Sequence, residues 1–402
     1  MLPVPNLLIL LMLLYACQPS GGKASATEPV VVRTADSLPP MVEYEALTFE
    51  RKELLTAAPG TKSVLFNAAG TRLYAMNLEG MSVYEFDQAS RRILREFRFT
   101  PTRGMGWDYN KSRPIASYQE KPVEGCLSHG DRILWVSLHN ADGIVPIRLD
   151  STGTGGPENA DRSKSKPLTI LYPGSDRRDS VRVPLILTGK TPKVIARTSD
   201  SHHLLVSNWH SRSVSVLQLN PDSYPYASLV SDVPVSAIPR GIAVDDRRGR
   251  SYVAIMGGST MATIDHRTWK SDTVYPVSSS PRHVVLDSLG RLFVSYNSLG
   301  QVACLDAATG KTLFTAATHA QPRTIVLSKN QRFLFATCYS SDHLDVFKVH
   351  ADRFEKVASL PCAGHPVGVD IFEDRDKLEA WVCSYSNGAI QVYTFKKSNP
   401  LK

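Results

Sequence analysis

Four basic residues recur at one place in a repeated sequence pattern. Lys193, Arg240, Arg282 and Arg323 each follow a proline directly, and an Ile or Val stands two positions further on. Because a repeat puts equivalent residues at equivalent places in a fold, these four charges are expected to converge. Converging guanidinium and ammonium groups favour carboxylate or phosphate ligands. The alternative is structural: each cation packs against carbonyl groups of the neighbouring repeat.

Histidine and aromatic residues mark a second aligned position, directly after the second apolar run of each repeat. The residues there are Leu78, His139, Trp209, Gly257, Asn297, Tyr339 and Tyr385. Aromatic rings at the rim of a site suit flat ligands or the side chains of a partner. Together the two positions, with neighbouring histidines and an aromatic insertion, predict a basic, aromatic-lined binding site. Its candidate residues are Lys193, Arg240, Arg282, His283, Arg323, His139, Trp209, His210, Tyr339, His343, Tyr385 and Trp107.

Motifs for metals, cofactors and catalysis are not seen in the sequence. The histidines near the predicted site have neither i,i+4 nor H-x-H spacing, which a compact metal site would need. There is no C-x-x-C-H haem attachment, no G-x-S-x-G turn and no P-loop. We therefore expect no metal, no cofactor and no enzymatic activity. Glu124 and the Asp342-His343 pair are polar groups for which the sequence suggests no partner.

The elements that must position these residues are short strands. Five repeats begin at prolines that are 47, 42, 41 and 44 residues apart, namely Pro192, Pro239, Pro281, Pro322 and Pro366. Each proline begins an apolar run, a second run follows, and after a polar turn comes a third with alternating apolar residues. Alternation at period two is typical of strands with one buried face. Trp135 and Trp381 lie within such runs and are expected in the core, as are Cys126, Cys304, Cys338, Cys362 and Cys383.

Two further copies precede these five, so the sequence contains seven units of about 40 residues. Seven units of four short strands predict an all-β, seven-bladed β-propeller over residues 42–396, with a tail at 397–402. The last unit ends on its third strand, and we expect Val42–Phe49 to supply the fourth and close the ring. Insertions interrupt the period at about 100–118 and 150–179. The second is rich in Gly, Ser and charged residues and is expected to be a solvated loop.

The N-terminus has the pattern of an export signal. Eight apolar residues, Leu7–Leu14, are too few to span a membrane and resemble the core of a signal peptide over residues 1–16. They lead to Ala16-Cys17, which resembles a bacterial lipobox, so Cys17 is expected to carry a lipid. Residues 17–41 are then a flexible tether. We expect an outer-membrane lipoprotein of the cell envelope, periplasmic or surface-exposed and anchored to the membrane through this lipid.

The repeat resembles the YncE-like, YVTN-repeat propellers over about residues 42–396. The P-R-x-I/V starts carry the resemblance, together with second strands such as Leu134-Trp135-Val136 and third strands that end near Asp87, Asp150 and Asp306. The resemblance implies a seven-bladed β-propeller with a binding role. Lipidated surface propellers that capture corrinoids beside an outer-membrane transporter are similar in layout. An outer-membrane protein complex or a TonB-dependent transporter is therefore an expected partner.

Pro281-Arg282-His283 also resembles the P-R-H stretch of lactonase-type propellers. That resemblance implies an enzyme with His283 as base and Arg282 as oxyanion stabiliser. The acidic residue that usually follows Asn in the next loop is missing, because Asn297 is followed by Ser298. A lactonase-type enzyme and a purely structural scaffold remain the alternatives to a binding protein.

Composition restricts the partners less sharply. The 402 residues carry a formal net charge of +8, with 42% hydrophobic and 21% charged residues. These proportions exclude disorder throughout, and the single apolar run excludes a polytopic membrane protein. An exported protein rarely meets nucleic acid, so we expect none as partner. An anionic small ligand or glycan fits the charge better.

Overall fold

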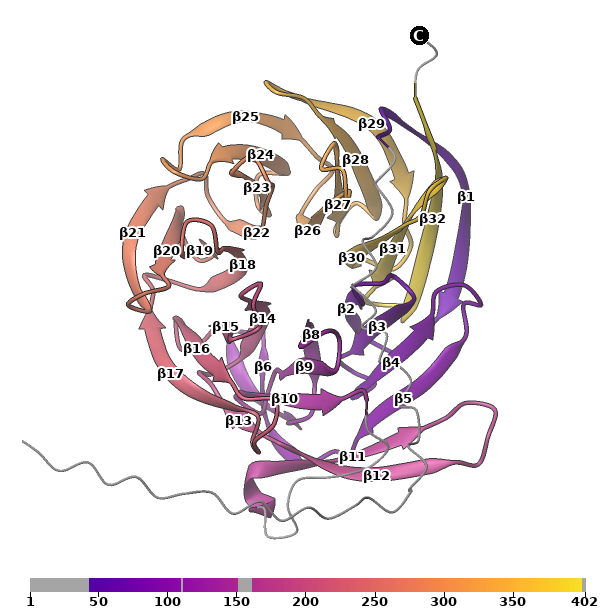
Figure 1. Ribbon diagram of the computed structural model, residues 1–402, viewed down its shortest axis with the longest axis vertical. Coiled ribbons are helices and arrows are strands. Elements are labelled where there is room, and N and C mark those ends of the chain that lie inside the picture. The colour runs from indigo at the N-terminus through magenta and orange to yellow at the C-terminus, as the bar shows by residue number, and fades with distance from the viewer. Residues whose placement is uncertain (1–42, 110, 151–160, 400–402) are drawn as a thin grey trace, which may run out of the picture. The chain divides into compact units, whose positions relative to one another are not determined.

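The computed structural model describes residues 43–109, 111–150 and 161–399. In these residues there are 32 strands and a single short 3₁₀ helix, Arg162–Lys164. The strands form seven sheets that stand around a central axis, with one extra two-stranded hairpin (Figure 1). The chain is thus an all-β, seven-bladed propeller, as the repeat predicted.

The blades are numbered along the chain, and each is given from its inner strand outwards. Blade one contains β2 (Thr61–Phe66), β3 (Arg72–Asn77), β4 (Ser82–Asp87) and β5 (Ile93–Phe99). Blade two contains β8 (Pro122–Ser128), β9 (Ile133–Leu138), β10 (Gly143–Arg148) and β13 (Ile186–Leu187). Blade three contains β14 (Pro192–Arg197), β15 (His203–Asn208), β16 (Ser213–Leu219) and β17 (Ala227–Pro234). Blade four contains β18 (Pro239–Asp245), β19 (Arg250–Ile255), β20 (Thr260–Asp265) and β21 (Lys270–Pro276).

The remaining blades follow the same plan. Blade five contains β22 (Pro281–Leu286), β23 (Arg291–Tyr296), β24 (Gln301–Asp306) and β25 (Thr312–Ala317). Blade six contains β26 (Pro322–Leu327), β27 (Phe333–Cys338), β28 (His343–Val349) and β29 (Phe354–Pro361). Blade seven contains β30 (Pro366–Glu373), β31 (Lys377–Ser384), β32 (Ala389–Ser398) and, from the N-terminal side, β1 (Ala46–Thr56).

The core lies between the blades. Seven clusters of buried apolar residues occur in the described chain, one between each pair of neighbouring blades. Trp135 is fully buried between blades two and three, and Trp381 between blades seven and one. The middle strands bury both faces, whereas outer strands such as β21 are exposed on most positions. Apolar burial of this kind is the main stabilising contribution in a sheet-on-sheet packing.

The ring is closed by β1, which pairs antiparallel with β32. The observed closing strand begins at Ala46 and ends at Thr56. The expected strand, Val42–Phe49, therefore overlaps it only over Ala46–Phe49. A partly buried ion-pair cluster reinforces this closure. Arg91, in the turn after β4 of blade one, contacts Glu379 on β31 at 2.7 Å and Glu53 on β1 at 3.2 Å. We call these three residues the closure cluster.

The two insertions both contain strands. Residues 100–118 include a hairpin of β6 (Arg103–Asp108) and β7 (Arg113–Tyr118), which pair only with each other. The expectation of a solvated loop at 150–179 is wrong for its second half. There β11 (Ser165–Leu171) adds to β5, and β12 (Arg178–Pro184) adds to β11, so that blade one has a six-stranded sheet. The reason is that Leu168 and Ile170 alternate in β11 and are buried, a short pattern hidden among charged neighbours.

The expected signal peptide, Cys17 and most of the tether lie outside the described residues. In the described part of the chain, no helix is long and apolar enough to span a lipid bilayer.

Candidate functional site

A bulge at the start of the inner strands turns the basic residues toward the axis. In blade three Pro192 pairs with Asn208 and Ile195 with Val206, so Lys193 and Val194 together oppose one residue. The same register shift follows the first proline of blades two, four and six. A bulge redirects the side chain that it carries. The proline therefore marks the place where the chain can present a residue to the centre of the ring.

The backbone at this position is held by the preceding blade. The Ser137 hydroxyl donates to the Lys193 carbonyl at 2.8 Å, and the Ser295 hydroxyl donates to the Arg323 carbonyl at 2.8 Å. A hydroxyl of the preceding blade donates in the same way to the carbonyl of Val123 in blade two and to that of Val367 in blade seven. Since valine serves equally well there, the repeat requires the carbonyl and not a cation. The structural explanation thus accounts for the backbone but leaves the positive charges unexplained.

Five of the seven equivalent positions carry a cation. Blade one contributes Lys62, which follows Thr61 instead of a proline and was missed in the sequence for that reason. We call these five residues, from blades one, three, four, five and six, the cation ring: Lys62, Lys193, Arg240, Arg282 and Arg323.

The second aligned position lies beside the first in every blade. The amide of the residue after the second strand donates to the carbonyl of the residue before the first, as from Trp209 to Thr191 at 3.0 Å and from Tyr339 to Gln321 at 3.0 Å. The same bond occurs in all seven blades. It places the residue that follows the second strand close to the first aligned position, which carries a cation in five of the blades.

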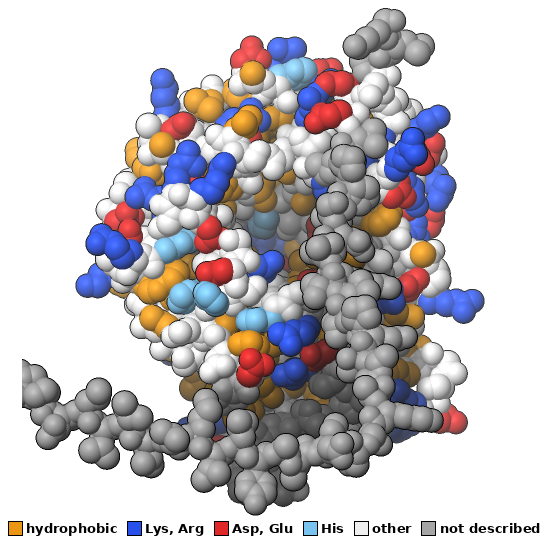
Figure 2. Space-filling model, viewed as in Figure 1, with side chains coloured by type: hydrophobic (Ala, Val, Ile, Leu, Met, Phe, Trp, Pro, Cys, Tyr) orange, Lys and Arg blue, Asp and Glu red, His pale blue; other side chains and the backbone are white. Residues whose placement is uncertain are grey.

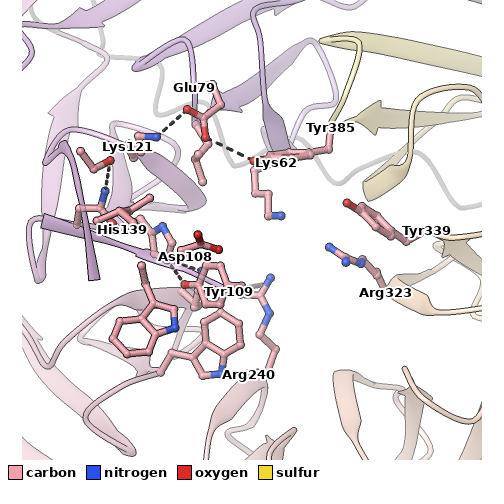
Figure 3. Close-up of a pocket in the computed structure, with 18 of the residues that line it drawn as sticks. Lys62, Glu79, Asp108, Tyr109, Lys121, His139, Arg240, Arg323, Tyr339 and Tyr385 are labelled. Carbon is pink, nitrogen blue, oxygen red and sulfur yellow. Dashed lines mark hydrogen bonds and ion pairs between the residues drawn. The ribbon is translucent and has the colours of Figure 1, made fainter. Parts of the chain in front are cut away.

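The two sets and the hairpin β6–β7 enclose a cavity of about 620 Å³, the central cavity. Figure 2 shows the hollow at the centre of the ring in a face view, and Figure 3 shows Lys62, Arg240 and Arg323 reaching into the cavity from different blades. The described lining includes six Lys and Arg side chains, which are the cation ring and Lys121, and two carboxylates, Glu79 and Asp108. Glu79 pairs with Lys121 at 2.6 Å. The interior of the cavity is therefore strongly positive.

The aromatic side chains hold the cations rather than present free faces. The Arg323 guanidinium lies 3.4 Å from the ring centroid of Tyr339, Lys62 Nζ lies 4.5 Å from that of Tyr385, and Lys193 Nζ lies 4.6 Å from that of Trp209. Cation–π contacts of this kind contribute roughly 0.5–2 kcal/mol. They stabilise several like charges around one cavity, and contact of these rings with a flat ligand or a partner side chain stays a prediction.

Burial and mutual repulsion oppose these charges. Burial lowers the pKa of Lys62 and of Lys193 well below the ordinary value, and the surrounding guanidinium groups lower both further. Burial, then Arg240 and Arg323, also lower the pKa of Arg282. Burial and Arg240 bring the pKa of Arg323 to about 10, although Tyr339 acts in the opposite direction. A bound anion would relieve each of these effects.

Three buried donors on residues that line the central cavity have no hydrogen-bond partner in the part of the chain that the structure describes. They are Arg240 Nη1, Arg323 Nε and the Trp209 indole Nε1. Buried polar atoms are almost always hydrogen-bonded, and leaving one unsatisfied costs about 1–3 kcal/mol. Since all three are donors, the group that would satisfy them is an acceptor, such as a carboxylate or phosphate oxygen.

One carboxylate outside the described lining pairs with the cation ring. Glu124 Oε1 lies 3.4 Å from Arg240 Nη2, so the residue for which the sequence suggested no partner has one. It balances one of the five charges. The contact joins blade two to blade four, past blade three, a pairing that no local sequence pattern could reveal.

The hairpin β6–β7 covers part of the mouth of the central cavity. Its Tyr109 ring stacks on Trp209 at 4.9 Å, and its hydroxyl lies 2.8 Å from His139 Nε2. The Trp107 ring contacts His210 in a tilted arrangement, with 5.0 Å between the ring centroids. Burial raises the pKa of Tyr109, which keeps the phenol protonated. On its other side the hairpin borders a lateral cavity of about 530 Å³, which Trp107 and His210 line.

Nine of the twelve predicted site residues line the central cavity: Lys193, Arg240, Arg282, Arg323, His139, Trp209, Tyr339, Tyr385 and Trp107. The other three lie elsewhere. His210 faces the lateral cavity, His343 stacks on His319 at 4.1 Å, and His283 does not line either cavity. The lining also contains residues that the repeat did not single out, among them Lys62, Glu79, Tyr109, Lys121 and Asn140.

The arrangement expected for a lactonase is not present in the described residues. No carboxylate there lies within hydrogen-bonding distance of the His283 ring, whose Nδ1 is 3.5 Å from the amide of Ile325. Burial, Arg240 and Arg282 lower the pKa of His283 to about 3. The imidazole is neutral and lacks the acid that would orient it as a base.

Metal ligands are not clustered in the part of the chain that the structure describes, where no group of three or more His, Cys, Asp or Glu residues could hold an ion. The five cysteines there are free, and four of them are buried.

Fold and site define the class: a seven-bladed propeller with a cationic central cavity. No protein-family model and no curated protein matches the chain. Solved structures do, at the level of the fold. A chain of the mitotic checkpoint complex has a TM-score of 0.61 at 11% identity and covers 94% of this chain, with 99% of its own length matched. The WD40 propeller of Doa1 has a TM-score of 0.59 at 12% identity, with 88% and 97% covered.

A third similar structure is an enzyme. Virginiamycin B lyase from Staphylococcus aureus has a TM-score of 0.60 at 10% identity, with 86% of this chain and 99% of the lyase chain covered. At these identities the likeness establishes the propeller fold and not the function.

Proposed function

We propose that this protein is a non-enzymatic binding protein that holds a small anionic ligand in its central cavity. The observation that carries the proposal is the set of three unpartnered buried donors beside five cations, of which Lys193, Arg240 and Arg282 are only 4–8% exposed. Uncompensated buried charge destabilises a fold, so its presence is best explained by a ligand that compensates it.

The setting that we propose is the cell envelope. The signal-like segment 1–16, Cys17 and the tether 17–41 support an outer-membrane lipoprotein, and the repeat supports membership of the YncE-like propellers. Propellers of the same fold occur in a mitotic checkpoint complex, so protein partners are also within the range of the fold. We propose an outer-membrane assembly, such as a transporter, as the partner that exchanges the ligand.

Calorimetric titration of the full-length protein with citrate tests the ligand site. Citrate carries several carboxylates and is small enough for the cavity. We expect saturable binding to the wild type and a loss of at least about tenfold in affinity in an Arg240→Gln/Arg323→Gln variant, because hydrogen bonds to charged groups contribute roughly 1.5–3 kcal/mol each.

The matched control is Arg247→Gln/Arg267→Gln. It removes the same charge from two exposed arginines outside the cavity and should bind citrate like the wild type. Equal affinity of the wild type and the cavity variant would show that the cation ring is not the binding site.

A further inference from the structure

The amine of Lys193 has an unusual environment for a lysine. It is 4% exposed, it lines the central cavity, and no carboxylate of the described chain pairs with it. Its Nζ lies 2.7 Å from His139 Nε2, and the rings of Trp209 and Tyr109 lie 4.6 and 5.7 Å away. A lysine that is desolvated and close to other cations is a nucleophile at neutral pH, because more of it is unprotonated.

The charges that face Lys193 come from several blades. Burial is the largest influence that lowers its pKa, followed by Arg240, Lys62 and Arg282, and Glu124 acts in the opposite direction. The faces of Trp209 and Tyr109 also favour the ammonium form. Burial and three like charges lower the pKa of Lys193. The one carboxylate that raises it, Glu124, pairs with Arg240 and not with Lys193. The balance favours the neutral amine.

A hydrogen-bonding imidazole lies next to this amine. His139 Nε2 contacts both Lys193 Nζ at 2.7 Å and the Tyr109 hydroxyl at 2.8 Å. Burial and Lys193 keep the pKa of His139 well below its ordinary value, so the imidazole is a neutral acceptor. The same imidazole nitrogen can therefore accept a hydrogen bond from the amine or from the phenol.

Lys62 differs in this respect. It lies over Tyr385 and makes no side-chain hydrogen bond in the described structure. It has the charge environment of Lys193 without a neighbouring acid or base, which makes it an internal comparison.

We propose that Lys193 captures an anionic aldehyde or ketone as a reversible imine. The Nζ lone pair attacks the carbonyl carbon to give a carbinolamine. Both protons of the amine pass to the carbonyl oxygen, one as the carbinolamine forms and one as the C–O bond breaks, so that the oxygen leaves as water and a C=N bond replaces C=O. Hydrolysis reverses each step, so no oxidant or reductant is needed. The inference rests on the proposed function, because the remaining cations of the ring bind the carboxylate or phosphate of the same ligand.

Reductive trapping tests this proposal on the full-length protein. The probe is 2-oxoglutarate with sodium cyanoborohydride, which reduces an imine to a stable secondary amine, followed by peptide mapping by mass spectrometry. Glutarate has the same two carboxylates without the ketone and serves as competitor. We expect Lys193 to be labelled at least about tenfold faster than exposed lysines, and glutarate to protect it.

Two variants complete the design. Lys193→Arg removes the attacking amine and should lose the label, whereas Lys270→Arg, at an exposed lysine outside the central cavity, should keep the label at Lys193. Even labelling of all lysines, or preferential labelling of Lys62, would overturn the proposal. Binding of glutarate without trapping at Lys193 would refute only the covalent step, and absence of binding by both acids would refute the proposed function as well.

Discussion

At the scale of single residues, the site consists of side chains that the repeat does not need. The backbone carbonyl at the bulge accepts a hydrogen bond from a hydroxyl of the preceding blade, and it does so whether the residue is a cation or a valine. The examples are Lys193, Arg323, Val123 and Val367. The side chain is free to vary, and five blades have placed a cation there. Burial of these cations should make the ligand-free protein less stable than an apolar equivalent would be.

Arg282→Met tests this balance between stability and binding. Arg282 is 8% exposed, and its only contact within hydrogen-bonding distance in the described structure is with the sulfur of Met256 at 3.2 Å. In buffer without multivalent anions we expect the variant to have a free energy of unfolding about 1–2 kcal/mol higher than the wild type, measured by urea denaturation. Stabilisation by added citrate should shrink. The exposed control Arg267→Met should change neither, and a less stable Arg282→Met would contradict the account.

Much of the site could be predicted from the repeat, and the residues that could not be predicted were missed for physical reasons. The spacing of prolines gave Lys193, Arg240, Arg282 and Arg323, because equivalent residues of a closed ring face one axis. Lys62 escaped because the bulge in blade one starts with Thr61. The ion pair of Glu124 with Arg240 joins blades two and four, which are distant in sequence, so no local pattern could predict it.

At the scale of elements, the hairpin β6–β7 and the closure cluster have separate tasks. The hairpin pairs with no blade and contacts the site through Trp107 and Tyr109. It should therefore control access to the cavity without supporting the ring. The closure cluster joins β1, blade one and blade seven, and should support the ring without affecting the site.

Replacement of residues 103–118 by a short Gly-Ser linker tests the first task. The ring should keep its circular dichroism spectrum and cooperative unfolding, because no blade loses a strand. Citrate should dissociate at least about tenfold faster in stopped-flow measurements, since the rings that exclude water from the mouth are gone. Unchanged dissociation would show that the hairpin does not cover the site, and loss of folding would show that it supports the ring.

Glu379→Gln tests the second task. Burial alone would raise the pKa of Glu379, but hydrogen bonds from Arg91, Lys377 and Gln88 outweigh it and lower the pKa to about 2. The folded value is below the unfolded one, so the stabilisation is present above about pH 4.5 and is lost as the pH falls through about 2. The wild type should lose roughly 3 kcal/mol over this interval that the variant never has. Parallel unfolding curves of both proteins from pH 5 to 2 would contradict this role.

The insertions show where sequence patterns stop at this scale. Seven repeats determine seven blades, because each strand pair must bury its alternating face. The strands β11 and β12 are short and lie in a segment without the repeat pattern, and β11 takes its place beside β5 because blade one presents an edge there. Such a hairpin cannot be predicted from its own residues alone, because its strands need the edge strand β5 of blade one as a pairing partner.

At the scale of the whole molecule, a closed ring carries one cationic cavity on its axis, and the proposed lipid on Cys17 would hold that ring at a membrane surface. One acyl chain alone gives marginal binding, whereas the several chains of a bacterial lipoprotein give stable anchoring. A tether of the composition of residues 17–41 would leave the ring free to meet a partner.

Cys17→Ala tests this arrangement in a Gram-negative host. The wild-type protein should fractionate with membranes and incorporate labelled palmitate, and the variant should do neither. Cys126→Ala is the control, because Cys126 lies within the propeller and should leave both properties unchanged. Membrane association that persists in Cys17→Ala would contradict lipid anchoring at this residue.

The central claim, that the cation ring binds an anion, is tested most directly by diffraction from crystals soaked in selenate, a divalent oxyanion with a strong anomalous signal. The account predicts an anomalous peak within the central cavity, with selenate oxygens in hydrogen-bonding distance of Arg240 Nη1 and Arg323 Nε. Peaks confined to the exterior of the propeller, with none beside these two arginines, would contradict it.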